Sequence, residues 1–304
     1  MHMDLRDIEY FAVIAEHGHL GRAAEALGLG QPALSISLRR LEQAAKSKLV
    51  KRTPKGVELT AVGSALLSHV RRLQLARSDL ARELADLAHG RAGYLRIGTG
   101  PTITENLLAV TCTELLKDSA KVSFKITVSD NDVMIPAVRD GELDLIVNYL
   151  RPHPLENLVQ EKLYEDEHGV IASASHPLTR KKRVTLADLA QEKWALTEPA
   201  LLSQQWLSRK FQENGYHPPL CAFESRSIRL RLQAVASSDL LGFTSRQVLR
   251  QTAQRFRLVE IPVKELKWTR PIGVIYRKDA YLSPAAKRFI EILKATAKEI
   301  AKEP

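Results

Sequence analysis

Basic and polar side chains gather between residues 31 and 72, in a pattern suited to binding a polyanion. This stretch holds nine arginines and lysines against two glutamates, whereas residues 1–30 hold two arginines against five acidic side chains. Glutamine and serine at the start of a helix can reach base edges, and arginine can bind guanine or a phosphate. The segment is therefore suited to double-stranded DNA, and the residues expected to contact it are Gln31, Pro32, Ser35, Ile36, Arg39, Arg40, Arg52 and Lys55.

Three short helices are predicted to position these side chains. Apolar residues recur at helical spacing from about Asp4 to Glu16, and Gly18 is expected to end that helix. A second helix is predicted from about Arg22 to Leu27, and a third from Gln31 to about Ala45. The third helix carries an inward-facing apolar stripe at i, i+4 and i+7. The stripe consists of Leu34, Leu38 and Leu41.

The segment Lys51–Thr60 has the pattern of a β-hairpin with a Pro-Lys-Gly tip. A hairpin beside the third helix can lay Arg52 and Lys55 along the DNA backbone or in the minor groove. The third helix alone could equally be the solvated polar face of a small bundle. The helix-turn-helix spacing and the hairpin together favour DNA binding.

A specific set of spacings runs through Tyr10-Phe11, Ala23-Ala24, Gln31-Pro32-Ala33-Leu34-Ser35, Leu41-Glu42, Arg52-Thr53, Leu59-Thr60 and Gly63. This pattern resembles the winged helix-turn-helix of LysR-type transcriptional regulators, and the chain length and C-terminal layout extend the resemblance over essentially the whole chain. The family commonly has serine or threonine where Gly21 and Gly30 stand, at the expected starts of the two motif helices, and glycine is a tolerable N-cap. Where the family often has a polar residue, Ile36 would make an apolar contact with a thymine methyl.

Leucines recur at every seventh position after the hairpin, at Leu59, Leu66, Leu73, Leu80 and Leu87. A heptad kept over four repeats predicts a long helix with a dimerisation seam. A helix packed only on its own domain is the alternative. The family resemblance implies a linker helix that pairs two subunits, which would bring two reading helices to two half-sites.

Strand and helix signals alternate after residue 93. A helix is predicted from about Ile103 to Lys117, and Ser283-Pro284 is expected to open a terminal helix. Repeated βαβ units imply parallel sheets with helices on both faces. The strand candidates are Tyr94–Gly98, Val122–Val128, Leu143–Val147, Gly169–Ala172, Trp194–Thr197, Leu240–Phe243 and Ile272–Tyr276.

By the same resemblance, this region is a two-lobed effector domain similar to periplasmic solute-binding proteins. One lobe would comprise about residues 91–163 and 270–304, and the other about 164–269. The expected domains are a winged helix-turn-helix over 1–60, a linker helix for dimerisation over 61–90, and an effector-binding domain over 91–304. The fold class is therefore multidomain, with an all-α N-terminal domain, a long linker helix and an α/β C-terminal domain.

Ligands of open α/β sheets bind beyond the carboxyl ends of the strands, near helix N-termini. The loop from Thr99 to Glu105 has this position, although Thr102 and Glu105 also fit a capping box. Arg226 and Arg229 together with helix N-termini favour an anionic effector, a small organic acid. The residues expected to contact it are Thr99, Gly100 and Thr102, with Arg226, and by resemblance Asn131, Asn148, Thr197, Ser203, Ser225 and Thr244.

Motifs for catalysis are missing: there is no HExxH, no GxSxG, no GxxxxGK[ST], and Gly98-x-Gly100 lacks the third glycine of a dinucleotide fingerprint. We therefore expect no enzyme activity, no metal and no cofactor. The two cysteines, Cys112 and Cys221, lack CxxC partners and are each expected to be small buried hydrophobes. Without a run of eighteen apolar residues or a signal peptide, the protein is expected in the cytoplasm and not in a membrane.

The net charge of +10 agrees with a polyanionic partner. The sequence thus predicts a LysR-type regulator that binds an operator and responds to a small-molecule effector. Its expected partners are double-stranded DNA, the effector, a second copy in a homodimer or a tetramer, and RNA polymerase. The alternatives are an architectural DNA-binding protein, which would not need the second half, and a small-molecule-binding protein, which would not need the winged helix.

Overall fold

The computed structural model describes residues 3–54, 56–89, 93–118 and 121–302. The chain divides into two compact units, residues 1–90 and 91–304. No helix among the described residues is long and apolar enough to cross a membrane.

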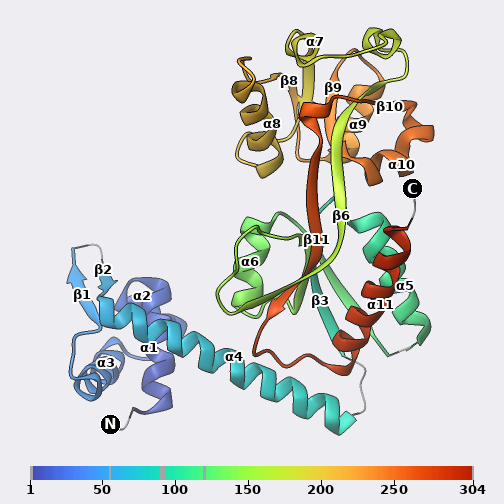
Figure 1. Cartoon of the computed structure of the whole chain (residues 1–304). Coiled ribbons are helices and arrows are strands. Elements are labelled where there is room, and N and C mark those ends of the chain that lie inside the picture. The colour runs from blue at the N-terminus through green and yellow to red at the C-terminus, as the bar shows by residue number, and fades with distance from the viewer. Residues whose placement is uncertain (1–2, 55, 90–92, 119–120, 303–304) are drawn as a thin grey trace. The chain divides into compact units, whose positions relative to one another are not determined.

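Unit 1 contains three helices, a hairpin and a long fourth helix (Figure 1). Its core encloses the fully buried side chains of Phe11, Ile14, Leu34 and Leu41, so the predicted apolar stripe of the third helix does face inward. The elements are α1 (Leu5–His17), α2 (Leu20–Ala26), α3 (Gln31–Ala45), β1 (Val50–Thr53), β2 (Gly56–Leu59) and α4 (Ala61–His89).

The helix ends follow their capping residues. Asp4 accepts a hydrogen bond from the amide of Arg6 and begins α1, and Gly18 ends that helix in the left-handed conformation, as predicted. The helix α2 begins at Leu20 and not near Arg22, because the Nδ1 atom of His19 accepts the amide hydrogen of Gly21 at 3.0 Å. The expectation that Gly21 opens this helix was therefore wrong. The bounds of α3 are those predicted.

The leucine repeat divides between two roles. Leu59 lies in β2 and not in the long helix, and both Leu59 and Leu66 pack against the core of unit 1. Further along α4, Leu73 and Leu80 are 52% and 55% exposed. The part of the predicted seam that unit 1 leaves uncovered therefore begins after Val70, which is buried in the core. The side chain of Leu87 lies outside the described residues.

Unit 2 alternates strands and helices along one mixed sheet (Figure 1). Its elements are β3 (Tyr94–Thr99), the π-helix η1 (Thr104–Leu108), α5 (Ala109–Asp118), β4 (Ser123–Val128), α6 (Asn131–Arg139), β5 (Leu145–Tyr149), β6 (Leu158–Ser173), the 3₁₀-helix η2 (Pro177–Arg180), α7 (Leu186–Ala190), β7 (Lys193–Leu196), α8 (Leu202–Glu213), β8 (Leu220–Glu224), α9 (Ile228–Ala236), β9 (Leu241–Ser245), α10 (Arg246–Phe256), β10 (Leu258–Ile261), the 3₁₀-helix η3 (Lys264–Leu266), β11 (Trp268–Arg277) and α11 (Pro284–Ile300).

The strand order is β4-β3-β5-β11-β6-β9-β7-β8, with β10 also paired to β6. Strands β4, β3 and β5 are parallel at one end, and β8, β7 and β9 are parallel at the other. Between them, β11 and β6 run antiparallel to each other over their length. The prediction of parallel sheets was therefore wrong for these two strands, because each is long enough to pass through both ends of the unit.

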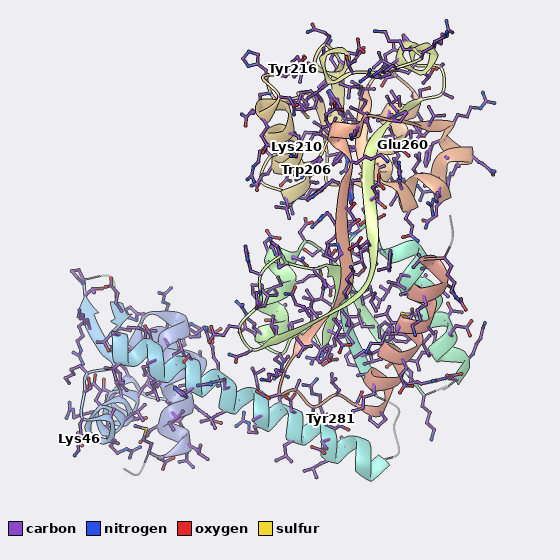
Figure 2. The ribbon with its side chains drawn as sticks, viewed as in Figure 1. Lys46, Trp206, Lys210, Tyr216, Glu260 and Tyr281 are labelled. Atoms are coloured by element: carbon purple, nitrogen blue, oxygen red, sulfur yellow. The ribbon has the colours of Figure 1, made fainter. Side chains whose placement is uncertain are left out.

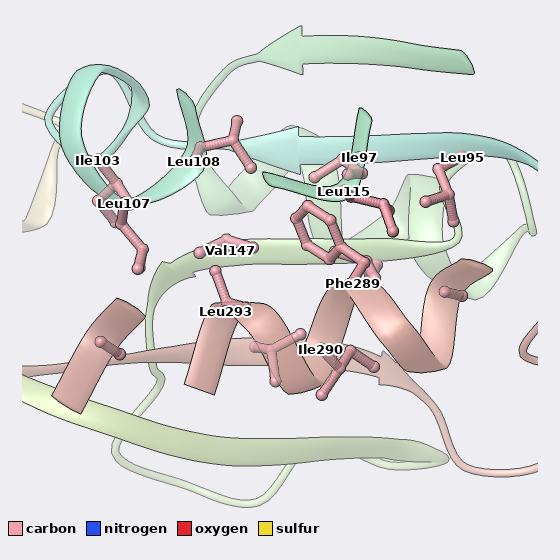
Figure 3. Packing of buried hydrophobic residues seen from close by; sticks show 14 of the residues in the cluster. Leu95, Ile97, Ile103, Leu107, Leu108, Leu115, Val147, Phe289, Ile290 and Leu293 are labelled. Atoms are coloured by element: carbon pink, nitrogen blue, oxygen red, sulfur yellow. The ribbon is translucent and has the colours of Figure 1, made fainter. Parts of the chain in front are cut away.

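Separate hydrophobic cores define two lobes joined by β6 and β11. In lobe 1, Phe289 and Leu293 of α11 pack with Leu95, Ile97 and Val147 of the sheet (Figure 3). In lobe 2, the fully buried core side chains include Trp194, Leu207 and Phe211. On β6, Tyr164 belongs to the core of lobe 1 and Val170 to the core of lobe 2. This strand therefore passes from one lobe to the other at about residues 165–169.

The two edge strands leave apolar side chains uncovered within the unit. Ile126 and Val128 of β4 are exposed, although their alternation predicted a half-buried strand. On β8 at the opposite edge, Leu220 and Cys221 are exposed. The expectation of a buried thiol was therefore wrong for Cys221. Cys112 is partly buried, and burial raises the pKa of its thiol to about 11.

Candidate functional site

The outer face of α3 carries most of the residues expected to contact DNA. Gln31, Pro32, Ile36 and Arg39 are exposed, and Ser35 is half-buried on the same helix. No side chain caps the N-terminus of α3, because its N-cap residue is Gly30. The first turn therefore presents free backbone amides, which favour an anion.

Arg40 differs from the other candidate residues because it holds two helices together. Its guanidinium donates hydrogen bonds to both carboxylate oxygens of Asp7 on α1, at 2.6 and 3.0 Å. Ser37 donates a third hydrogen bond to the same buried carboxylate at 2.6 Å. Burial alone would raise the pKa of Asp7, but the hydrogen bonds from Arg40 and Ser37 outweigh burial and hold this pKa below its ordinary value. The charge of Arg40 is thus largely compensated within unit 1.

The β1–β2 hairpin is anchored to the turn between α1 and α2. The amide of Val57 donates a hydrogen bond to the carbonyl oxygen of Gly18 at 2.9 Å. Gly56 has φ +138°, and a Cβ there would lie 2.1 Å from that oxygen, so only glycine fits. Lys51 and Arg52 project from β1 and are exposed. Lys55, also expected to contact DNA, lies outside the described residues.

Some basic side chains on and near α3 and the hairpin are paired with an acidic side chain, and others are not. Lys48 pairs with Glu42 at 2.7 Å, and Glu42 also accepts the amide hydrogen of Leu49. Among the described residues, Arg39, Lys51 and Arg52 have neither an ion-pair nor a hydrogen-bond partner on their side chains. The uncompensated charge of this region therefore lies on α3 and the hairpin, where it could bind phosphates.

A cavity of about 550 Å³ lies within unit 2, at the carboxyl ends of its parallel strands. Lobe 1 lines it with Gly100 after β3, with residues 128–132 around the end of β4, and with Asn148 on β5. Lobe 2 lines it with Thr197 after β7 and Thr244 on β9. Open α/β sheets bind ligands at this position.

Most of the residues expected to contact an effector line this cavity. Those that do are Gly100, Thr102, Asn131, Asn148, Thr197, Ser203, Arg226 and Thr244. Thr99 is fully buried behind the cavity wall, and Ser225 accepts the amide hydrogen of Ser227 outside the lining. Arg229, the second arginine of the anion argument, also lies outside this lining and borders a surface groove on α9.

The two lining asparagines are largely engaged with each other. The amide nitrogen of Asn148 donates to Oδ1 of Asn131 at 2.9 Å, and Asn131 donates to the carbonyl oxygen of Tyr149 at 2.8 Å. A Cβ at Gly100 would lie 2.4 Å from Oδ1 of Asn148, so glycine is needed for this packing. The side chain of Glu105 lies outside the described residues, so the capping box of Thr102 and Glu105 stays a prediction. The hydroxyl of Thr102 lies 3.5 Å from the hydroxyl of Tyr149.

The guanidinium of Arg226 is also bound by acidic side chains of the protein. Its guanidinium donates two hydrogen bonds to Glu198, at 2.5 and 2.6 Å, and lies 3.7 Å from Asp130 of lobe 1. Burial raises the pKa of Asp130, and Arg226 opposes that rise. Arg231 donates a hydrogen bond to the carbonyl oxygen of Ser225 at 2.5 Å. These contacts compensate much of the charge at this part of the cavity.

The sequence did not predict two residues that line the cavity, Arg270 on β11 and His168 on β6. The guanidinium of Arg270 on β11 lies over the rings of Tyr149 and Trp268, at 3.9 and 4.5 Å from their centroids. Burial lowers the pKa of Arg270 to about 10. His168 on β6 is buried, and burial together with Arg270 lowers the pKa of its imidazole to about 3, so the ring is neutral at physiological pH. Both residues lie in mixed polar stretches, residues 165–168 of β6 and 267–270 at the start of β11, where residue type gives no signal that one of them lines a cavity.

An aromatic stack supports this part of the cavity. Trp206 of α8 lies in lobe 2 (Figure 2) and is stacked against Phe243 and Trp268, at centroid distances of 5.6 and 5.0 Å. His168 contacts both Phe243 and Trp268 at 5.7 and 5.5 Å. The stack holds the cavity-facing ring of His168 in place. Across the described residues, no group of three or more His, Cys, Asp or Glu side chains is placed to bind a metal ion.

Two family models match the chain. Residues 5–64 match the bacterial regulatory helix-turn-helix protein, lysR family, and residues 88–298 match the LysR substrate binding domain. A curated relative, the SDS degradation transcriptional activation protein of a Pseudomonas strain, is 32% identical over 93% of both chains. The HTH-type transcriptional regulator GbpR of Azospirillum brasilense is 28% identical, over 97% of this chain and 87% of the relative.

Solved structures of full-length proteins share the fold. A full-length variant of OxyR from Pseudomonas aeruginosa is 22% identical, with a TM-score of 0.62 over 98% of this chain and 95% of the other. Full-length CbnR, solved in complex with its target DNA, is 20% identical, with a TM-score of 0.62 over 97% of this chain and 100% of the other. The arrangement of a helix-turn-helix unit and a two-lobed α/β unit is therefore one that solved proteins share.

Proposed function

Because this chain belongs to the LysR family of bacterial transcriptional regulators, with a helix-turn-helix domain and an effector-binding domain, we propose that α3 and the β1–β2 hairpin are its operator-reading surface. The observation that carries this proposal is the uncompensated charge of Arg39, Lys51 and Arg52 beside the free amide end of α3. Gln31 and Ser35 would contact base edges from the first turns of that helix. Arg52 and the neighbouring Lys55 would hold the phosphate backbone.

The working unit is proposed to be a homodimer paired along α4. Leu73, Leu80 and Leu84 are more than half exposed in the single chain and share one face at heptad spacing. A second copy would cover this face and bring two α3 helices to two half-sites. The exposed apolar side chains on the edge strands β4 and β8 offer a second contact surface, through which two dimers would form a tetramer.

The cavity of unit 2 is proposed to bind a small anionic effector. Arg270 supports an anion, because it is a half-buried cation that makes neither an ion pair nor a hydrogen bond among the described residues. Binding would change the relative stability of arrangements of the two lobes, and with it the preferred arrangement of the DNA-bound oligomer. RNA polymerase at the same promoter is the proposed further partner, and the cytoplasm is the proposed place of action because the DNA is there.

The experiment that tests this function is a footprint of the full-length protein on genomic DNA, followed by gel-shift titration on the recovered sites. We expect protected half-sites related by two-fold symmetry and an affinity that falls steeply with salt. Protection spread evenly over the DNA would instead indicate an architectural protein. The output is proposed to be control of transcription and not catalysis.

A further inference from the structure

Three buried polar atoms of the cavity have no hydrogen-bond partner among the residues that the structure describes. They are Nδ1 of His168 and the hydroxyl oxygens of Thr197 and Thr244. A buried polar group without a partner has lost its hydrogen bonds to water without replacement, so such groups concentrated in one cavity point to a ligand that would satisfy them. The same lining contains Arg270, a cation whose guanidinium makes no hydrogen bond among the described residues.

These groups line the same cavity as two pairs, Thr197 with Thr244 and His168 with Arg270, because neighbouring residues of a strand point to opposite faces of the sheet. Thr244 of β9 pairs with Gly169 of β6, next to His168. Strands β7 and β9 are parallel, with Ala195 opposite Gly242, so Thr197 follows in line with Thr244. His168 in turn pairs with Trp268, which lies beneath the Arg270 guanidinium, and both His168 and Arg270 contact Tyr149.

Each of these groups can donate a hydrogen bond. Hydroxyls donate one bond each, a neutral imidazole donates from one nitrogen, and a guanidinium donates several. The neighbouring carboxylate of Asp166 is already engaged, because it accepts the hydroxyl hydrogen of Tyr149 at 2.6 Å. Asp166 also pairs with Arg270 across β6 and β11, and its charge raises the pKa of Arg270, whereas the charge of Arg151 lowers it. An anion near Arg270 and Arg151 would be attracted by both cations.

The rest of the lining fits an organic body better than an inorganic ion. A volume of about 550 Å³ is large for phosphate alone, and Leu201, Leu202, Ile228 and Phe243 contribute apolar surface. Elsewhere in the lining, Arg226 pairs with Glu198 and lies near Asp130, and Asp132 and Arg231 add one charge of each sign, so this part of the cavity has little net charge. One free anionic position next to an apolar space is the pattern expected for a carboxylate on a hydrocarbon or aromatic body.

We propose that Arg270, His168, Thr197 and Thr244 form a carboxylate subsite on and beside the crossing strands, which makes the effector an organic monocarboxylate. This inference rests on the proposed effector role of the cavity. The further point concerns where the negative charge of the effector binds. The ligand carboxylate lies where β6 and β11 pass between the lobes. A ligand held there contacts both strands that connect the lobes.

The test uses isosteric pairs that differ in charge, benzoate against benzamide and hexanoate against hexanamide, with inorganic phosphate as a further probe. Binding to the full-length protein is measured by calorimetry and thermal shift at up to millimolar concentration. Hydrogen bonds to a charged group contribute enough for about a tenfold preference for each carboxylate over its amide. The variant Arg270→Gln should abolish this preference, and Thr244→Val should reduce it several-fold.

The matched control is Arg229→Gln, which removes an exposed arginine outside this cavity and should keep the preference. Equal binding of carboxylate and amide, an unchanged preference in Arg270→Gln, tighter binding of phosphate, or no binding of any probe would each overturn the subsite. Thr244→Val keeps the test decisive if Arg270→Gln folds poorly. Operator binding is measured separately, so loss of the DNA function and failure of the carboxylate subsite give different results.

Discussion

Arg40 of α3 binds the buried carboxylate of Asp7 of α1 through two hydrogen bonds, and this contact links α1 to the helix that we propose reads the operator. The same carboxylate accepts the hydroxyl of Ser37. Arg40, which the sequence predicted to contact DNA, therefore connects α3 to α1.

Loss of this carboxylate should destabilise unit 1. Asp7→Ala leaves the buried Ser37 hydroxyl without its acceptor and removes the link to Arg40, at an expected cost of about 2 kcal/mol in the free energy of unfolding. Chemical denaturation followed by far-ultraviolet circular dichroism measures it. The exposed neighbour Asp4→Ala, which loses only an N-cap, should cost about 1 kcal/mol. Equal losses in the two variants would contradict a special role for Asp7.

The same contact makes stability depend on pH with a definite sign. The pKa of Asp7 is lower in the folded state, so its contribution is complete above the unfolded value of about 3.9 and is lost as the pH falls toward the folded pKa. We expect the stability difference between the wild type and Asp7→Asn to be largest near neutral pH and to shrink in acid. Unfolding curves over that range measure it. A difference that stayed constant down to strongly acidic pH would rule out this ionisation.

Removal of a free cation should weaken operator binding without unfolding the domain. Arg39→Ala and Arg52→Ala should each lower affinity and reduce the slope of log K against log salt by about one. Gel-shift titrations over a salt series measure both quantities. Lys287→Ala, an exposed lysine of α11, is the control and should leave the slope unchanged. If the slopes of all three variants match the wild type, these arginines do not contact phosphate.

Contact between Ile36 and a base can be tested by changing the DNA instead of the protein. It is 54% exposed on α3 and lies among polar neighbours, where an apolar side chain can contact a thymine methyl. Replacing thymine by uracil at the contacted base pair should weaken wild-type binding by about fourfold, the value of one buried methyl. Ile36→Ala should not distinguish the two bases. Uracil outside the footprint is the control, and an unaffected wild type would exclude this contact.

A charged side chain in the leucine seam of α4 should weaken the proposed dimer. Leu73→Glu or Leu80→Glu would bury a carboxylate in an apolar contact, which should weaken the dimer by more than about tenfold. Sedimentation velocity over a concentration series reports the change. Gln74→Glu adds the same charge at an exposed neighbouring position and should leave assembly intact. A dimer that survives both leucine substitutions would have to be held by another surface.

Local signals in the sequence carried much of the fold. The stripe of Leu34, Leu38 and Leu41 and the left-handed Gly18 were predictable because helix periodicity and capping depend on near neighbours. The link between Asp7 and Arg40 was not, since it joins residues 33 apart. Leu59 continued the heptad in sequence, yet β2 places it against the unit 1 core.

The residues that line the cavity also divide into those that the sequence predicted and those that it did not. Thr197 and Thr244 were predictable because they follow strand signals at the carboxyl edge of the sheet, where ligands bind. His168 and Arg270 lie within the crossing strands, whose antiparallel pairing depends on register between segments about one hundred residues apart. Residue type alone did not separate them from other polar residues of the chain.

The passage of β6 and β11 through both lobes also fixes an order of assembly. Lobe 2 is built from one continuous stretch between these strands, whereas the core of lobe 1 needs both Leu95 and the late residues Phe289 and Leu293. On the ribosome, all residues of lobe 2 are made before α11, and the core of lobe 1 waits for α11. A nascent protein therefore completes the cavity only after α11 has emerged, well after unit 1 and lobe 2.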